Sequence, residues 1–120
     1  MPDGKGIKLF EPDIKQGDEI QFMMRDSYEI ASSAERNSTE LMDNIKGDGR
    51  KAVFGLYIDC AGRTAQYSNS PVEEASKVQE VFNRYNTPLL GFYSGVEVAP
   101  LMGRSRGLDW TGVLLVFAER

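Results

Sequence analysis

The stretch Val53-Phe54-Gly55-Leu56-Tyr57-Ile58 decides the fold, because it contains no charged residue and is apolar nearly throughout. A strand covered on both faces of a sheet has this composition, whereas a strand with one solvated face alternates apolar and polar residues. The run Asp59-Cys60-Ala61-Gly62-Arg63 follows directly and introduces charge. We therefore expect a central strand over 51–58 whose carboxyl end opens into a polar loop over 59–69.

A second stretch repeats this pattern. Leu89-Leu90-Gly91-Phe92-Tyr93 runs into Ser94-Gly95-Val96-Glu97, so small residues again end a buried strand and a charge follows. In open α/β sheets, ligands bind in the crevice just past the carboxyl ends of the strands. Arg63 and Glu97 follow two such ends, and the sequence therefore predicts a polar small-molecule site between them.

Two helices are predicted between and before these strands. Asp26 followed by Glu29 is a capping-box pattern that starts the first helix, and the glycines of 47–49 end it. Ser70-Pro71-Val72-Glu73 predicts the start of the second, with Ser70 as N-cap and proline at the first helical position. An apolar face follows at helical spacing in the second helix: Ala75, Val78, Phe82 and Tyr85.

The remaining elements complete a mixed α/β (α+β) fold. Short strands are predicted at 7–10 and 19–25, a tight turn at 103–107, and a last strand at 113–118 that returns antiparallel. The expected order is strand, strand, helix, strand, helix, strand, strand, which gives a mixed sheet of about five strands with two main helices. Short strand-helix-strand connections of this kind are usually right-handed crossovers between parallel strands.

Length and composition indicate one globular domain over 7–120, preceded by a flexible N-terminus at 1–6. The net charge is −4 and the basic residues are dispersed, which argues against nucleic acid as a partner. No apolar run approaches the ~20 residues needed to cross a bilayer, and no signal peptide is recognisable. We expect no membrane span and a cytoplasmic location.

Histidine is absent and there is one cysteine, which excludes several chemistries. Neither a Ser-His nor a Cys-His nucleophile pair can form, and a zinc site of Cys and His ligands is excluded. Arg63 lies three residues after Cys60, but position 66, where a tyrosine-phosphatase loop places its arginine, is Gln66. A small, packed Cys60 is therefore favoured over a nucleophile, and we predict no catalytic residue, no metal and no cofactor.

The charged candidates have alternative interpretations, which the sequence leaves open. Arg63 could bind a ligand carboxylate or phosphate with its forked guanidinium, or it could form a salt bridge with Glu97 or Asp59. Glu97 stands between Val96 and Val98. If it is buried, it needs a cationic partner or a raised pKa, which would mark a functional site, and if it points outward it is a solvated edge charge.

Two motifs together resemble a known family. Cys60-Ala61-Gly62-Arg63, an amphipathic helix, and the run from Pro88 to Ser94 that leads to Glu97-Val98-Ala99-Pro100 resemble the C-terminal half of the FIST sensory domain, over roughly 7–119. The family normally has glycine before the glutamate, where this chain has Val96. The resemblance implies a small-ligand sensory domain of signal-transduction proteins, bacterial ones among them, whose natural partners are a FIST N-terminal half and attached signalling modules.

Our leading hypothesis is a non-catalytic sensory domain that binds a small polar ligand, with an amino acid as the first class to consider. Arg63 would hold the carboxylate and Glu97 the amine, and loop 59–69 would move. The candidate ligand-binding residues are Cys60, Gly62, Arg63, Gly91, Tyr93, Gly95 and Glu97.

Two other hypotheses remain. The first is an interaction or scaffold domain without a ligand, which would expose an apolar strand edge at 7–9 or 22–24 for self-pairing or for docking the other half. A homodimer also stays open. The second is an enzyme that uses Cys60 or Glu97.

Overall fold

The structure is a computed structural model that describes residues 4–7, 9 and 13–120. Its first helix, α1 (Ser27–Gly47), leads into the long strand β1 (Lys51–Cys60). Two short helical segments and a third helix follow: η1 (Ala61–Arg63), α2 (Ala65–Ser68) and α3 (Glu74–Arg84). The chain ends with four strands: β2 (Leu89–Ser94), β3 (Glu97–Leu101), β4 (Arg104–Leu108) and β5 (Gly112–Glu119).

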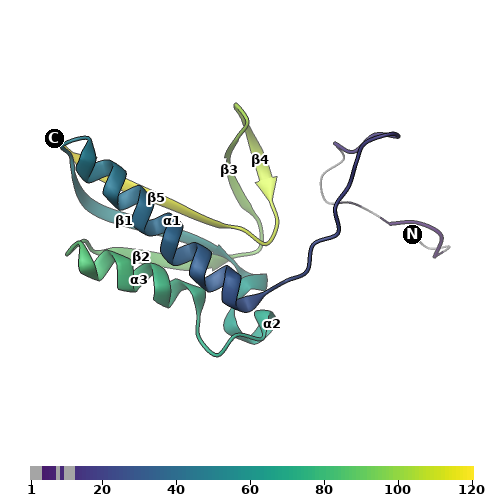
Figure 1. Cartoon of the computed structure of the whole chain (residues 1–120), viewed down its shortest axis with the longest axis horizontal. Helices are drawn as coiled ribbons and strands as arrows, with labels where there is room; N and C mark the ends of the chain where they lie inside the picture. The colour runs from purple at the N-terminus through teal and green to yellow at the C-terminus, as the bar shows by residue number, and fades with distance from the viewer. Residues whose placement is uncertain (1–3, 8, 10–12) are drawn as a thin grey trace.

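Strand β1 is the centre of a three-stranded sheet of order β2-β1-β5 (Figure 1). It pairs parallel with β2 and antiparallel with β5, while β3 and β4 form a separate antiparallel hairpin. The predicted mixed α/β class is therefore confirmed. Because β1 and β2 are parallel neighbours, their carboxyl ends meet, with Cys60 opposite Ser94.

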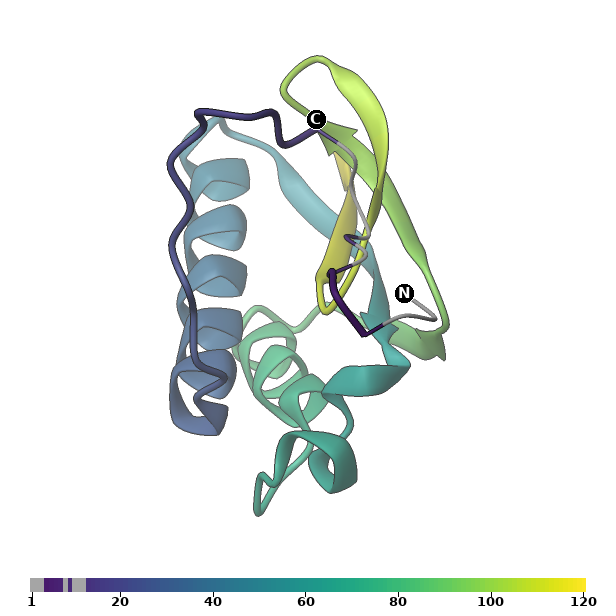
Figure 2. The same ribbon diagram turned by 90° about the vertical axis from the view of Figure 1, so that its right-hand side faces the viewer.

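The core lies between this sheet and the helices, which Figure 2 shows on one side of it, with the β3–β4 hairpin on the other. Alternate residues of β1, Gly55 and Tyr57 among them, are buried toward the helices. The buried apolar core combines residues of α1, β1 and α3: Ala34, Met42, Tyr57, Val78, Val81 and Phe82. Gly55 permits the close approach of α3, since a Cβ there would lie 2.2 Å from Cε1 of Phe82.

Helix α1 begins as the capping pattern predicts. The Asp26 carboxylate accepts hydrogen bonds from the backbone N–H groups of Tyr28, at 2.9 Å, and Glu29, at 3.1 Å. These two bonds satisfy donors that the first helical turn would otherwise leave without a partner.

Helix α3 begins later than predicted, at Glu74 with Glu73 in the N-cap position, so the assignment of Ser70 as N-cap is wrong. The Ser70 hydroxyl instead donates to the carbonyl of Val72 at 2.7 Å and accepts from its N–H at 3.3 Å. A serine side chain that bonds its own neighbouring backbone in this way stabilises a turn and competes with helix formation.

Three other predicted segments differ from the structure. Residues 19–25 form no strand but part of an extended arm that runs away from the sheet (Figure 1). Of the strand predicted at 7–10, residues 8 and 10 lie outside the described residues, and Ile7 and Leu9 are not in a strand. The predicted turn at 103–107 is mostly strand β4, and the chain turns instead at Met102 and Gly103, which both have positive φ.

We predict that Gly55→Ala destabilises the fold by about 1–3 kcal/mol, because the added methyl group overpacks the contact with Phe82. Urea unfolding followed by circular dichroism would measure this loss. Gly95→Ala is the matched control, since a Cβ at Gly95 would meet no atom within 4 Å. Equal stabilities of the two variants would contradict the packing argument.

Candidate functional site

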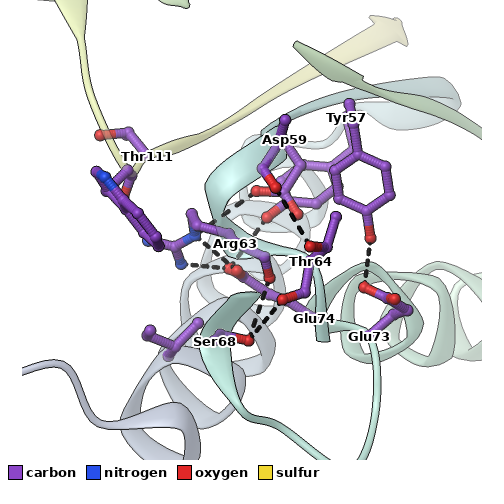
Figure 3. Close-up of polar contacts among 12 residues, drawn as sticks. Tyr57, Asp59, Arg63, Thr64, Ser68, Glu73, Glu74 and Thr111 are labelled. Carbon is purple, nitrogen blue, oxygen red and sulfur yellow. Dashed lines mark hydrogen bonds and ion pairs between the residues drawn. The ribbon is translucent and has the colours of Figure 1, made fainter. Parts of the chain in front are cut away.

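A cluster of charged and phenolic side chains lies where β1 ends, and Arg63 is its centre (Figure 3). The Arg63 guanidinium donates two hydrogen bonds to the Glu74 carboxylate, from Nε to Oε2 at 2.7 Å and from Nη2 to Oε1 at 2.6 Å. Its Nη1 donates to the backbone carbonyl of Trp110 at 2.7 Å. This one side chain therefore joins η1 to the start of α3 and to the loop before β5.

Glu74 also accepts a hydrogen bond from the Tyr57 hydroxyl, at 3.0 Å. Both residues are buried, and burial raises the pKa of the Tyr57 phenol, with the charges of Glu74 and Asp59 acting in the same direction. Tyr57 therefore stays neutral and serves as a donor to Glu74. The carboxylate is held by three hydrogen bonds from two side chains.

Asp59 is buried in the same cluster, with 1% of its surface exposed, yet neither carboxylate oxygen has a hydrogen-bond partner among the described residues. Arg63 Nε lies 3.6 Å from Asp59 Oδ1, an ion pair without a hydrogen bond. Burial, reinforced by Glu74, raises the pKa of Asp59 to about 7, although Arg63 acts in the opposite direction. Its surroundings therefore favour the protonated form of Asp59 relative to an exposed aspartate.

Glu97 is the first residue of β3 and is also buried, with 1% of its surface exposed. Neither of its carboxylate oxygens has a hydrogen-bond partner in the described part of the chain. The hydrogen bonds of the Arg63 guanidinium go to Glu74 and Trp110. Of the two ion-pair partners considered from the sequence, Asp59 is paired with Arg63 at 3.6 Å. Helix α3 brings Glu74 to Arg63, and this partner was not among those considered from the sequence.

Two cavities adjoin the cluster, and Tyr57 lines both. The first, the Arg63 cavity, has a volume of about 300 Å³ and lies between α1 and the sheet. Polar residues on its wall include Ser33, Asn37, Ser38, Arg63, Glu74 and Thr111. The second, the Asp59 cavity, has a volume of about 220 Å³ and lies between α3 and the β1–β2 pair. Its walls are formed by Tyr57, Asp59, Ala75, Gln79, Leu89, Gly91, Phe92 and Tyr93.

Comparison with known proteins adds one finding. The family model described as FIST C domain matches residues 1–100. The chain belongs to the FIST C domain family. FIST C domains occur in signal-transduction proteins. Neither the curated proteins nor the solved structures yield a significant match. No described helix of this FIST C domain has the length and apolar character needed to cross a bilayer.

The residues predicted to form the ligand site of this FIST C domain are not all brought together. Gly91 and Tyr93 line the Asp59 cavity, whereas Arg63 lines the Arg63 cavity, and Glu97 lines neither. The Tyr93 hydroxyl donates to Glu73 at 2.6 Å, which links the end of β2 to the start of α3.

The other three predicted site residues line neither cavity. Gly62 packs against Trp110, since a Cβ there would lie 2.8 Å from the indole ring, and Gly95 has open space around it. Cys60 is buried and is not in a disulfide, as the interpretation of a packed cysteine expects.

Sequence reasoning missed Glu74 and Tyr57 as members of the cluster. A signal for Glu74 was present: it lies four residues before Val78 and eight before Phe82, on the apolar face of α3. An acidic residue on a buried helix face needs a partner, and Arg63 supplies it. Tyr57 gave a weaker signal, because its position in a buried strand does not distinguish a hydrogen-bonded phenol from a packed ring.

We predict that Arg63→Ala destabilises the FIST C domain by about 3–5 kcal/mol, because it leaves buried carboxylates without their cation. Arg84→Ala is the matched control, since its ion pair with Glu35 is exposed to solvent and should cost no more than about 1 kcal/mol. Urea unfolding of both variants measures the difference. Similar losses of unfolding free energy in the two variants would show that the buried ion pairs of Arg63 stabilise the fold no more than an exposed ion pair does.

We predict that Asp59 makes stability fall as pH rises from about 4 to about 7. Its pKa is about 7 when folded and 3.8 ordinarily, so the folded chain binds more protons in this range. Asp59→Asn should remove this pH dependence of the free energy of unfolding. Above pH 7 the variant should be more stable than the parent chain by at most about 4 kcal/mol. Urea unfolding across this pH range measures both effects. Asp109→Asn, at an exposed site, is the control and should change the pH dependence of stability little. If the curves of unfolding free energy against pH are parallel for the parent chain and both variants, Asp59 is not the group responsible.

Proposed function

We propose that this chain is a ligand-binding sensory domain and that its ligand is a small molecule with a cationic amine, amino acids being the first class to test. The observation that supports this proposal is the buried Asp59 carboxylate on the wall of a cavity, without a hydrogen bond from any described residue. A buried carboxylate is costly unless it is paired or protonated. A ligand ammonium group would supply both the charge and the donors.

The charges of the cluster support a cationic ligand rather than an anionic one. The described ion pairs of the cluster set two buried carboxylates, Asp59 and Glu74, against one guanidinium, that of Arg63. Glu74 takes two donors of Arg63, and the Trp110 carbonyl takes a third. The site therefore lacks positive charge, and we assign the ligand amine to Asp59 in place of Glu97.

The dimensions and walls of the Asp59 cavity suit a small molecule. Its volume of about 220 Å³ corresponds to the share of liquid volume of roughly seven waters. Ala75 and Leu89 provide apolar surface, while Tyr57 and Tyr93 share the cavity wall with Asp59. An amine on a short apolar chain would satisfy each of these walls.

In this proposal Arg63 would bind the carboxylate of the ligand. The guanidinium has five N–H donors, of which three are used in the described contacts. The remaining two belong to Nη1 and Nη2, and Arg63 lines the cavity where Asn37 and Ser38 also lie. An amino acid that engages both charged groups would have to extend past Tyr57, which lines both cavities.

We further propose that the domain is non-catalytic and relays ligand binding to an attached signalling module. Tyr93 lines the Asp59 cavity, and its hydroxyl donates a hydrogen bond to the Glu73 carboxylate. The same carboxylate accepts a hydrogen bond from the backbone N–H of Ala65 at 2.9 Å. A ligand that displaces Tyr93 would therefore loosen the contacts between β2, α2 and the start of α3. Binding can shift an equilibrium only by its differential affinity for two states, and this link is where we expect the two states to differ.

We predict that amino acids or small primary amines bind with measurable affinity by isothermal titration calorimetry, whereas neutral isosteres do not. Asp59→Asn should weaken binding about tenfold or more, because the carboxylate that faces the ammonium group is lost. Glu40→Gln, on the exposed side of α1, is the matched control. Below pH 7 the affinity should fall and binding should release a proton, since Asp59 must ionise to pair with the amine.

Titrations in buffers of different ionisation enthalpy would detect that proton. Amine binding that is unchanged in Asp59→Asn would refute the assigned site. Binding of neutral isosteres as tight as that of the amines would refute the ligand class.

A specific observation also favours the second function considered from the sequence, an interaction domain. One face of the three-stranded sheet is apolar and exposed to solvent, with Phe92 at 54% and Phe117 at 53% exposure. Large exposed apolar patches mark interaction sites. The side chains of this surface lie on the side of the sheet away from α1 and α3, and Phe92 also lines the Asp59 cavity.

A further inference from the structure

The sheet face opposite the helices is apolar as a consequence of the register. Phe54, Leu56 and Ile58 alternate with the β1 residues that point to the helices. Their neighbours across β2 and β5, which share the same face, are also apolar. We call this set the open face: Phe54, Leu56, Ile58, Leu90, Phe92, Val113, Leu115 and Phe117.

The open face remains accessible in the described structure. Leu90, Phe92, Leu115 and Phe117 are each more than two-fifths exposed. Figure 2 shows the helices on the other side of the sheet and the β3–β4 hairpin on the side of the open face. The exposed fractions of the four side chains show that the hairpin does not cover them. A contiguous apolar surface of this kind is unfavourable in water and is typical of an interaction site.

A second apolar surface without cover is the arm, residues 13–25. Within it, the five residues Ile20-Gln21-Phe22-Met23-Met24 contain no charge. Phe22 is 88% and Met24 is 93% exposed. In an extended chain Ile20, Phe22 and Met24 point to the same side, so the arm presents a narrow apolar stripe, in a segment whose composition predicts a strand.

The two ends of the arm are fixed on their own domain. The Arg25 guanidinium lies 3.3 Å from the centroid of the Trp110 ring and donates to the Tyr67 carbonyl at 3.3 Å. Asp13 forms an ion pair with Arg106 of β4. Between these points the arm runs away from the sheet of its own chain (Figure 1), which leaves the stripe available to another molecule.

We propose that two copies of this chain form a dimer in which the arm of each copy lies on the open face of the other. The dimensions agree, because five extended residues span about 17 Å and three strands are about 14 Å wide. A second copy is the occupant that uses both surfaces. Reciprocal exchange about a two-fold axis covers two arms and two open faces at once.

The test is sedimentation velocity of the full chain over a wide concentration range, with two variants. Phe22→Asp places a charge on the arm, and Leu90→Asp places one on the open face without touching the Asp59 cavity. Each should raise the dimer dissociation constant about tenfold or more. Tyr28→Asp is the matched control, because Tyr28 is 76% exposed on α1, on the other side of the sheet. Circular dichroism confirms that each variant is folded.

Mixing the two variants identifies which surfaces meet. A Phe22→Asp copy paired with a Leu90→Asp copy retains one intact contact of arm with open face. Native mass spectrometry should therefore show a heterodimer that is more stable than either variant homodimer. If Phe22→Asp dimerises as well as the parent chain, the open faces stack on each other and the arm exchange is wrong. A parent chain that stays monomeric at every concentration overturns the proposal.

Discussion

The bidentate ion pair between Arg63 and Glu74 is the interaction on which the arrangement of this domain depends. It joins the segment after β1 to the first residue of α3, and the same guanidinium holds the Trp110 carbonyl before β5. A buried ion pair recovers its desolvation cost only when its geometry is good and its other donors and acceptors are satisfied. Tyr57 and Trp110 supply those additional hydrogen bonds, so the pair specifies how α3 and β5 meet the end of β1.

The same interaction creates the electrostatic imbalance of the candidate site. Because Glu74 occupies the fork of the guanidinium, Asp59 is left with one ion-pair contact of 3.6 Å and no hydrogen bond among the described residues. Burial is the main cause of the raised pKa of Asp59, and the charge of Glu74 adds to it. Functional sites commonly keep such locally unfavourable groups, since their stabilisation by a ligand is what gives binding its energy.

The sequence predicted what depends on local pattern and missed what depends on tertiary partners. Apolar composition identified β1 and β2 and placed their carboxyl ends together, and the Asp26 cap located the start of α1. The partner of Arg63 depends on where α3 begins, and the serine of the 70–73 pattern stabilises a turn instead of a helix. The composition of 19–25 is that of a strand, but a strand also needs a neighbour, which this segment lacks within the described chain.

Strand β1 contributes residues to both the Asp59 cavity and the open face. Its odd-numbered residues Tyr57 and Asp59 line the ligand cavity, and its even-numbered residues Leu56 and Ile58 belong to the open face. Because successive side chains of a strand point to opposite sides, a shift of β1 by one residue would place apolar groups in the cavity and a carboxylate on the open face. The register of one strand therefore separates charge from apolar surface, and it places the proposed ligand site and the proposed dimer surface on opposite sides of the same sheet.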